Sequence, residues 1–329
     1  MSIRSIKSTI LIAVLMLSFS CGKTKDQEVK DAVLSANIYL STKQCQPAID
    51  VLESMGRQTS NALYLKTLAS AYACRAEYSS VVLFGTDIEK TASPAPLGGM
   101  STYTTSTVAS TSPLTDDLKY RDLQTAIDIL LYAGGIPLTT EPSAALRATK
   151  FSANHAGDIN TQIAFMMMVQ AGKFMKVYGN TNAAGVKSLG GGSNTCFTSY
   201  ANVNNGVSTA ILASGSTGNC SGINSGHPQL IGPASDPERR KRLCEGVVLF
   251  NGILDLLPSI IASAGGTALG NVGVQIDIIN QARQDLEDDY PTIGTIMNTL
   301  SQTNCENDAS ITEAIIELYY LAYVEALIE

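Results

Sequence analysis

Cysteine is the residue type through which this sequence offers its clearest chemistry. The chain has seven of them: Cys21, Cys45, Cys74, Cys196, Cys220, Cys244 and Cys305. A thiol can carry a lipid as a thioether, or it can pair with a second thiol in an oxidising compartment. No two of these cysteines form a Cys-x-x-Cys motif, so their spacing does not indicate a zinc site or a thioredoxin-like redox site.

The segment before Cys21 has the organisation of a bacterial export signal. Basic residues precede an apolar run from Ile10 to Leu17, and small residues then lead to Cys21. The run is too short for a stable membrane anchor, which needs about 20 residues. We therefore predict a signal peptide over residues 1–20.

The end of this segment resembles a bacterial lipoprotein signal, whose cysteine receives a diacylglyceryl thioether and becomes the acylated N-terminus. It departs from the usual pattern at Ser18, where an aliphatic residue is typical. The alternative is ordinary cleavage after Ser20, which leaves a soluble secreted or periplasmic protein with a free thiol. An odd cysteine count favours acylation of Cys21, because six thiols then remain to pair. Gly22 follows instead of Asp, and the resemblance then implies the outer membrane, facing the periplasm, with palmitate-type chains and a tether over residues 21–27.

The six remaining cysteines allow many pairings, among which the sequence does not choose. We predict bonds between nearest neighbours: Cys45 with Cys74, Cys196 with Cys220, and Cys244 with Cys305. The first bond would join two helical pairs, and the third would join two helices about 60 residues apart. The second would close an irregular insertion and lower its entropy in the unfolded state.

Motifs for catalysis or metal binding do not accompany the cysteines. A phosphate-binding loop, a zinc-binding histidine pair and a Gly-x-Ser-x-Gly motif are all missing from the sequence. The two histidines are His155, interpreted as a surface or capping residue, and His227, interpreted as an exposed loop residue. We therefore predict that the protein is not an enzyme and has no catalytic residue, cofactor or metal.

The charge of the chain excludes one large class of partner. Removal of the signal peptide leaves 20 basic against 29 acidic residues, a net charge of −9. Nucleic-acid binding needs a concentrated positive surface, so we predict no nucleic-acid partner. Hydrophobic residues make up 45% of the chain, which is enough for a sizeable core.

Residues 28–90 show helical periodicity in successive pairs of apolar runs. Ala36 and Tyr39 of the first pair recur 33 residues later as Ala69 and Tyr72. The apolar members of the second pair include Ala62, Leu63, Leu65, Leu68, Val81, Val82 and Phe84.

This spacing resembles the tetratricopeptide repeat, a helix-turn-helix unit of about 34 residues. The small and aromatic positions match in both copies; Ala48 fills the later alanine position of the first copy, and Val81 replaces it in the second. The resemblance covers about a fifth of the chain. It implies stacked helical hairpins with a concave groove, in which alanines let the helices approach and the aromatic residues shape the groove. An ordinary pair of helical hairpins is the alternative.

The rest of the chain predicts a larger helical domain over residues 115–329, after a Ser-, Thr-, Gly- and Pro-rich linker or loop over 91–114. A Gly-, Ser- and Asn-rich insertion occupies about 180–234. Helices are expected over about 116–131, 142–153, 158–178, 237–261, 274–288, 293–302 and 311–329.

The last of these helices is apolar almost all round. Its charges, Glu313, Glu317, Glu325 and Glu329, fall on one four-residue row, which predicts a narrow solvent-exposed stripe. The dense positive run over 239–242 is likewise expected to form exposed first turns of a helix.

We therefore predict an all-α fold in which stacked helical hairpins precede a larger helical domain. The predicted function is non-catalytic: a membrane-tethered lipoprotein that presents a helical surface to another periplasmic or outer-membrane protein. The alternative is a periplasmic binder of a small apolar ligand, or a solute-uptake accessory protein, with a cavity between the helices of Met166 and Val247. A third possibility is a structural surface component that exposes the insertion.

Overall fold

The computed structural model describes residues 23–92, 96–108, 114–214, 217–220, 222, 225–233, 235–263, 280–281 and 283–328. Over these residues the chain is all-α, as predicted, and a single isolated β-bridge joins Cys196 to Gly226. None of the helices within this part of the chain is both long enough and apolar enough to cross a bilayer. The predicted signal peptide and Cys21 lie outside the described residues.

The elements follow one another in this order: α2 (Lys25–Ser41), α3 (Cys45–Glu53), α4 (Ala62–Arg75), α5 (Ser80–Val82), η1 (Leu83–Asp87), η2 (Ile88–Ala92), α6 (Pro96–Ser101), η3 (Thr104–Ser106), η4 (Leu114–Asp116), α7 (Leu118–Leu131), α8 (Ala144–Lys150), α9 (Ala153–Tyr178), α10 (Asn205–Ala213), α11 (Pro237–Ser263), η5 (Pro291–Ile293), α13 (Gly294–Met297), α14 (Gln302–Asn307), α15 (Glu313–Tyr319), η6 (Tyr320–Val324) and α16 (Glu325–Leu327). The helix expected over 293–302 is thus divided between η5, α13 and α14. The helix expected over 274–288 is helical from 283 onward, and its first residues to 279 lie outside the described part.

Polar side chains start the longer helices by bonding backbone N–H groups that the helix leaves free. Thr24 and Gln27 form a capping box at the start of α2, with Gln27 N donating to Thr24 Oγ1 over 3.3 Å and Thr24 N to Gln27 Oε1 over 3.1 Å. Ser152 caps α9, and Asp117 caps α7 through a 2.9 Å bond from Tyr120 N.

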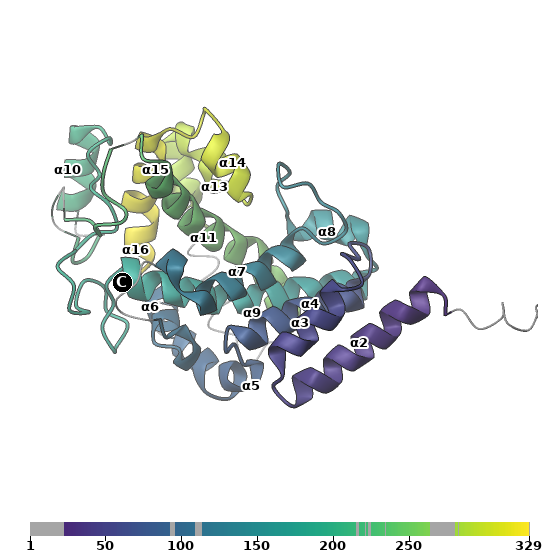
Figure 1. Ribbon diagram of the computed structural model, residues 1–329. Coiled ribbons are helices and arrows are strands. Elements are labelled where there is room, and N and C mark those ends of the chain that lie inside the picture. Colours follow the sequence, from purple (N-terminus) through teal and green to yellow (C-terminus); the bar gives the residue numbers. More distant parts are fainter. Residues whose placement is uncertain are drawn as a thin grey trace, which may run out of the picture.

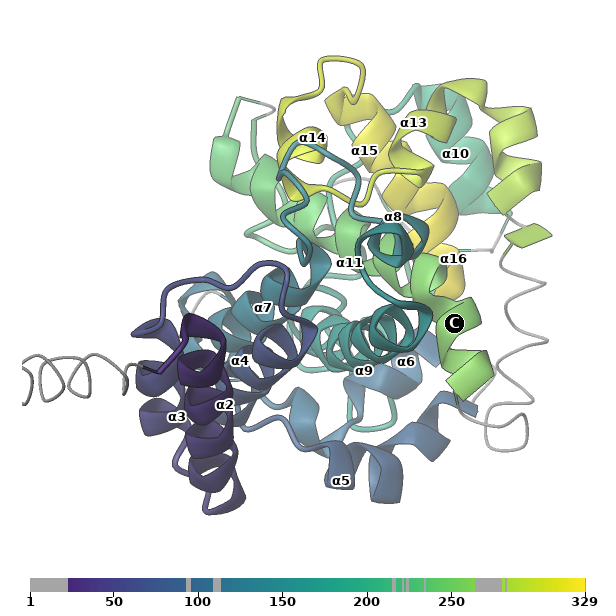
Figure 2. The same ribbon diagram turned by 90° about the vertical axis from the view of Figure 1, so that its right-hand side faces the viewer.

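Helix α9 runs through the middle of the molecule (Figure 1, Figure 2) and is buried around most of its circumference. It packs most extensively on α11 and α6, and also on α7, α8 and α4. Helices α2, α3 and α4 lie together on one side of it (Figure 2). The N-terminal helices and the larger helical part therefore share one continuous core.

The segment over 91–114, predicted as a linker or loop, contains α6, which is packed against α9. Glycines allow the backbones to approach closely at this packing contact. A Cβ at Gly99 would lie 2.2 Å from Lys90 O, and a Cβ at Gly172 of α9 would lie 2.2 Å from Met100 O. A side chain at position 99 would hold α6 away from η2, and one at position 172 would hold α9 away from α6, so the Gly–Gly pair that indicates a loop instead belongs to a tightly packed helix.

The carboxylates of the C-terminal helix are buried, which contradicts the prediction of a solvent-exposed stripe. We call Glu313, Glu317 and Glu325 the acidic row; Glu329 lies outside the described residues. The side chains of Glu317 and Glu325 are fully buried, and that of Glu313 is 12% exposed. A charge of this kind remains in a protein interior only when it is paired and hydrogen-bonded.

The first turns of α11 supply part of that pairing. Arg239 is buried and pairs with both Glu313 and Glu317, the latter through an Nη2–Oε1 distance of 2.7 Å. Arg240 reaches Glu313 over 3.4 Å. The prediction that this basic run forms exposed turns is therefore wrong for Arg239, because its counter-charges lie more than 70 positions away in the sequence.

The insertion supplies the remaining partners of the acidic row. Lys187 Nζ lies 2.7 Å from Glu325 Oε2, and both side chains are fully buried. Phe197 N and the Tyr200 hydroxyl donate to Glu325 Oε1, and Asn202 donates twice to Glu317, over 2.7 and 2.8 Å. The irregular segment is therefore folded around the buried carboxylates of a distant helix.

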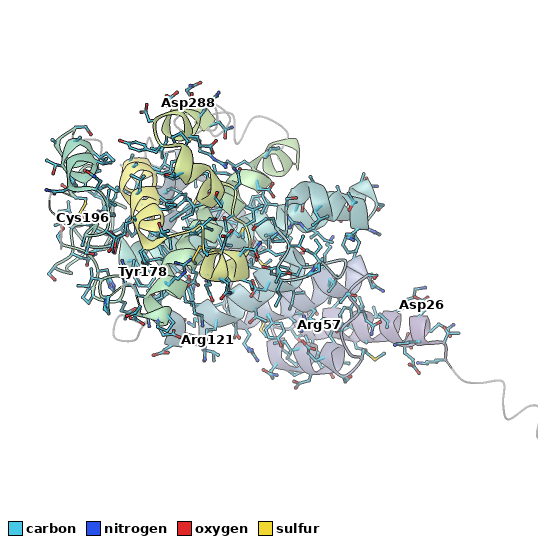
Figure 3. The ribbon with its side chains drawn as sticks, turned by 90° about the horizontal axis from the view of Figure 1, so that it is seen from above. Asp26, Arg57, Arg121, Tyr178, Cys196 and Asp288 are labelled. Atoms are coloured by element: carbon cyan, nitrogen blue, oxygen red, sulfur yellow. A yellow bond between two sulfur atoms is a disulfide. The ribbon has the colours of Figure 1, made fainter. Side chains whose placement is uncertain are left out.

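Three disulfides join the pairs that the sequence predicts. The Cα–Cα distances are 5.6 Å for Cys45–Cys74, 4.7 Å for Cys196–Cys220 and 5.6 Å for Cys244–Cys305. Cys196 lies at the opposite end of the molecule from Asp26 of α2 (Figure 3). The bonds thus secure the N-terminal hairpins, the insertion, and the contact of α11 with α14.

Candidate functional site

The most extensive hollow surface that we find near the N-terminal helices runs along α4, between α2 on one side and α5, η1 and α9 on the other. It consists of two adjoining hollows of about 540 and 570 Å³. Ser70, Tyr78, Ser80 and Gln162 border both of them, which makes the two hollows one continuous feature. We call it the N-terminal groove.

Covalent and polar contacts fix the walls of the N-terminal groove. The Cys45–Cys74 disulfide ties the start of α3 to α4 and borders one hollow. Lys66 of α4 pairs with Asp158 of α9 over 2.6 Å beside the other hollow. Gln162 Nε2 donates to Ser70 Oγ over 3.0 Å between the same two helices. The groove is therefore a preformed surface on rigid elements.

Exposed apolar side chains gather in this part of the molecule. Of the ten large hydrophobic side chains that are exposed among the described residues, six lie between positions 34 and 84: Leu34, Ile38, Tyr39, Leu63, Val81 and Phe84. Leu63 and Phe84 line the N-terminal groove, and the ring of Phe84 packs edge-on against Phe165 with centroids 4.6 Å apart. Concentrated apolar exposure is typical of an interaction surface.

Three of the four charged side chains at the rim are paired within the protein, and the fourth, Lys43, forms no ion pair among the described residues. Lys66 is held by Asp158, and Glu77 lies 2.6 Å from Lys119. Burial raises the pKa of Tyr78, so its hydroxyl stays neutral in the ordinary pH range. The groove therefore offers apolar contact, neutral hydrogen bonding and the side chain of Lys43.

The structure brings together the alanines of the predicted repeat and places the aromatic residues differently. Ala36, Ala48 and Ala69 are fully buried between α2, α3 and α4. Tyr39 is 36% exposed, and the partly buried Tyr72 instead bonds Glu53 through its hydroxyl over 3.4 Å. The prediction that the tyrosines shape the groove is not borne out for Tyr39.

Two exposed residues of the apolar runs line the groove. Leu63 is 56% exposed and Phe84 is 50% exposed, and Val81, which is 80% exposed, is not part of the lining. The sequence itself indicates that Leu63 is exposed, because this residue lies off the row that Ala62, Leu65 and Tyr72 form on the buried face of α4. For Phe84 the sequence holds no equivalent signal, since its exposure depends on how η1 meets α9.

The two histidines lie at opposite ends of α9. His155 is exposed at the start of α9, as predicted. His227 is partly buried and not freely exposed: its Nδ1 accepts a 3.2 Å bond from Gln229 N, and its ring packs against Tyr178. Burial, with a smaller contribution from Arg242, lowers the pKa of His227 to about 4, so its imidazole is neutral at neutral pH.

One cluster among the described residues has the composition of a metal site, namely Cys196, Cys220 and Glu325. Its two cysteines are joined in a disulfide and offer no thiolate, and Glu325 is paired with Lys187. The cluster therefore belongs to the packing of the insertion.

The helices of Met166 and Val247, between which the sequence suggested an apolar cavity, are α9 and α11. They are in close contact: a Cβ at Gly252 would lie 2.7 Å from Met167 Cε. Met166, Met167 and Val247 are buried in that contact.

No known protein family matches this chain, and no curated protein or solved structure matches it either. A functional proposal therefore depends on the geometry of the chain itself.

Proposed function

We propose that this protein is a non-catalytic envelope lipoprotein, anchored through Cys21, whose N-terminal groove receives an amphipathic helix of another periplasmic or outer-membrane protein. The observation that carries the proposal is the gathering of exposed apolar side chains around a preformed groove. Leu63 and Phe84 would contact the apolar face of the incoming helix, and the serines and Gln162 would face its polar edge.

The walls of the groove favour a helical ligand over an extended one. An extended peptide gains affinity by adding a strand to a sheet edge, and the walls here are helices whose backbone groups already bond one another. A helix binds instead by placing side chains at positions i, i+3, i+4 and i+7 into an apolar groove. The N-terminal groove supplies such a surface along α4.

The anchor would hold the N-terminal groove close to the membrane. Thr24 already caps α2, so only Gly22 and Lys23 separate it from Cys21. An extended chain spans at most about 3.6 Å per residue, which limits this connection to roughly 10 Å. The groove borders the far end of α2, at Asn37 and Leu40, which lies about 20 Å farther along the helix at 1.5 Å per residue. The partner should therefore present its helix within about 30 Å of the bilayer surface. The three disulfides fit this location, because such bonds persist in oxidising compartments.

Site-specific photocrosslinking in the native envelope tests the groove. A photoreactive phenylalanine analogue at Leu63 or Phe84 should give one discrete crosslinked species, and the same analogue at Leu118 or Leu138, which are similarly exposed elsewhere, should not. The crosslinked protein is then identified, purified and bound to the wild-type chain in vitro. Leu63→Ser should weaken that binding by about tenfold or more, and Leu118→Ser should leave it unchanged. Equal crosslinking from all four positions would contradict the proposal.

The intact mass of protein purified from native membranes tests the anchor separately. A chain that begins at Cys21 and carries acyl chains, with six thiols that appear only on reduction, would support the tethered form. An unlipidated mass with one free thiol would remove the membrane anchor from the proposal and leave the groove to be judged by crosslinking.

A further inference from the structure

The three disulfides differ in how far the protein covers them. Cys196–Cys220 and Cys244–Cys305 are enclosed, and none of their four residues is more than 1% exposed. Both residues of Cys45–Cys74 are partly exposed, and both border the hollow of about 540 Å³ in the N-terminal groove. The proposed docking function relies on apolar side chains of the other hollow, so it does not use this disulfide.

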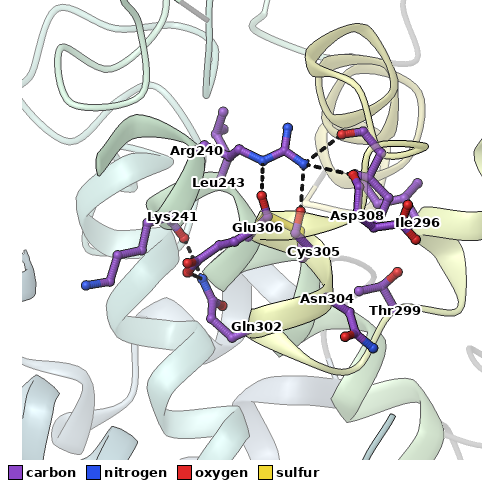
Figure 4. Close-up of a disulfide and its surroundings, with 12 residues drawn as sticks. Arg240, Lys241, Leu243, Ile296, Thr299, Gln302, Asn304, Cys305, Glu306 and Asp308 are labelled. Atoms are coloured by element: carbon purple, nitrogen blue, oxygen red, sulfur yellow. Dashed lines mark hydrogen bonds between the residues drawn. A yellow bond between two sulfur atoms is a disulfide. The ribbon is translucent and has the colours of Figure 1, made fainter. Parts of the chain in front are cut away.

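The Cys244–Cys305 bond shows what an enclosed disulfide looks like in this protein. It joins α11 to α14, and Arg240 of α11 donates to the backbone oxygens of Cys305 and Glu306 over 2.8 Å each (Figure 4). An external thiolate can reach these sulfur atoms only after α11 and α14 separate. Access is one of the factors that set the rate of thiol–disulfide exchange, so this bond should resist external thiols while the protein is folded.

The helices around the Cys45–Cys74 bond stabilise a negative charge on one of its two sulfur atoms. Cys45 is the first residue of α3, and the preceding Gln44 provides no side-chain bond to the first turn. The N-terminus of a helix carries a partial positive charge, which stabilises a thiolate. Cys74 lies in the last turn of α4, where the partial charge is negative. A better-stabilised thiolate leaves faster, so an incoming thiolate should bond to Cys74 and release Cys45.

The same hollow contains a cation that the protein does not neutralise. Lys43 lines the hollow, is exposed, and forms no ion pair among the described residues. The other charged side chain of the lining, Glu77, is paired with Lys119 over 2.6 Å. The hollow therefore presents a net positive charge, which attracts an anionic reactant and repels a cationic one.

We propose that the Cys45–Cys74 disulfide is a site at which a small anionic thiol becomes reversibly attached to the protein. The thiolate sulfur of the ligand attacks Cys74 Sγ and forms a new S–S bond; the Cys45–Cys74 bond breaks, and its electron pair leaves with Cys45 Sγ. The ligand sulfur is oxidised and Cys45 is reduced, so the step needs no other oxidant or reductant. Attack of the Cys45 thiolate on the mixed disulfide reverses it. A hollow of about 540 Å³ has the size of a small-molecule site.

Reaction of the folded wild-type chain, purified without reductant, with reduced glutathione tests the proposal. Samples taken over time are quenched with acid, alkylated and mapped by peptide mass spectrometry. We expect the Cys45–Cys74 bond to open at least about tenfold faster than either enclosed disulfide, with glutathione on Cys74 and the alkyl group on Cys45. A bond that opens no faster than the enclosed ones would overturn the proposal, as would glutathione attached to Cys45 instead of Cys74.

The preference for an anionic ligand is tested with two thiols of opposite charge, glutathione and cysteamine. Each is used at equal thiolate concentration, and its rate is divided by its rate with the neutral bis(2-hydroxyethyl) disulfide. We expect the corrected rate to be higher for glutathione. Lys43→Gln should lower the glutathione rate by about threefold, and Lys25→Gln, which changes an exposed lysine at the start of α2, should leave it unchanged. Equal corrected rates for the two thiols would overturn the assignment of an anionic ligand.

The dependence of the rate on thiol concentration separates reaction of the folded protein from reaction after unfolding. The rate of opening of the Cys45–Cys74 bond should rise in proportion to the glutathione concentration, because the bond is accessible in the folded chain. A rate that does not change with concentration would mean that unfolding limits the reaction, and it would overturn the proposal. These measurements use the wild-type chain without a bound partner, so their outcome does not depend on the proposed docking function.

Discussion

At the N-terminal groove and at the acidic row, the solvent exposure of the side chains departs from the helical pattern in opposite ways. At the groove, Leu63 and Phe84 belong to apolar runs and yet face solvent. At the acidic row, Glu317 and Glu325 form the one polar stripe of an apolar helix and yet are buried. A helical pattern tells which residues share a face, and it does not tell which face meets another element. An exposed apolar helix face therefore indicates a binding partner outside the chain. A buried acidic row indicates that its partners are basic residues of the same chain.

Removal of a counter-charge of the acidic row should have the largest effect on the free energy of unfolding. Arg239→Met leaves Glu317 buried without its cation and should lower the free energy of unfolding by about 3–5 kcal/mol. Arg57→Met, which removes a cation from the partly exposed Glu53, should change it by less than about 1 kcal/mol. Urea-induced unfolding measures both. Equal losses would mean that the acidic row contributes no more than a surface pair, and Glu317→Met added to Arg239→Met should recover part of the loss.

Two of the disulfides allow the stability of the two regions to be compared directly, because they close loops of similar length. Cys45–Cys74 spans 29 positions and Cys196–Cys220 spans 24, so chain entropy alone predicts about 3–4 kcal/mol for each. Paired Cys→Ser variants should show the larger loss for Cys196–Cys220, because that bond also positions Phe197 and Tyr200 against Glu325. Thermal unfolding of both variants, with and without reductant, measures the difference. A larger loss for the N-terminal bond would contradict the role given to the insertion.

The pH dependence of two single variants should have opposite signs. Burial alone would raise the pKa of Asp87 in η1, but bonds from Lys90 and Thr104 lower it overall, so its stabilising contribution is present above the unfolded pKa and is lost as pH falls. Burial raises the pKa of Glu325 despite Lys187, so the folded state loses stability as pH rises from the unfolded pKa through the folded one. Asp87→Asn should therefore cost more near pH ~7 than near pH ~3, and Glu325→Gln should cost more near pH ~4 than near pH ~8. Unfolding free energies across this range check both signs; slopes of the same sign would contradict the assignment.

The smallest effect on stability is expected at the N-terminal groove. Leu63→Ser in the groove and Val81→Ser in α5 each remove an exposed apolar side chain and should change the free energy of unfolding by no more than about 0.5 kcal/mol. Leu65→Ser, at a buried position two residues away on α4, should cost several times more. Urea-induced unfolding compares the three. A large loss at Leu63 would mean that this residue serves the fold, and the groove would lose its argument as a docking surface.

Much of the fold follows from local features of the sequence. The apolar periodicity gives α2, α3, α4, α7 and α9 close to their observed ranges, and capping residues such as Asp117 and Ser152 mark the first turns. The disulfide pairs follow from proximity in the chain, because a short loop between two thiols is entropically easier to close than a long one. Each of these inferences depends on residues within a few turns or one loop of each other.

The sites depend on contacts that no local pattern contains. Arg239 and Lys187 pair with the acidic row from positions more than 70 residues before it, and α4, α5 and α9 meet to form the N-terminal groove. Gly99 and Gly172 show the same dependence, since Gly99, in a segment predicted as a loop, lets α6 approach η2, and Gly172 lets α6 approach α9. Local features of the sequence are enough to predict the helices and the disulfide pairs, because helix propensity, capping and the entropy of closing a short loop all act over short stretches of the chain. Which helix faces are buried depends on the tertiary structure, because the free energy of a charged or apolar side chain depends on the neighbours that folding brings to it.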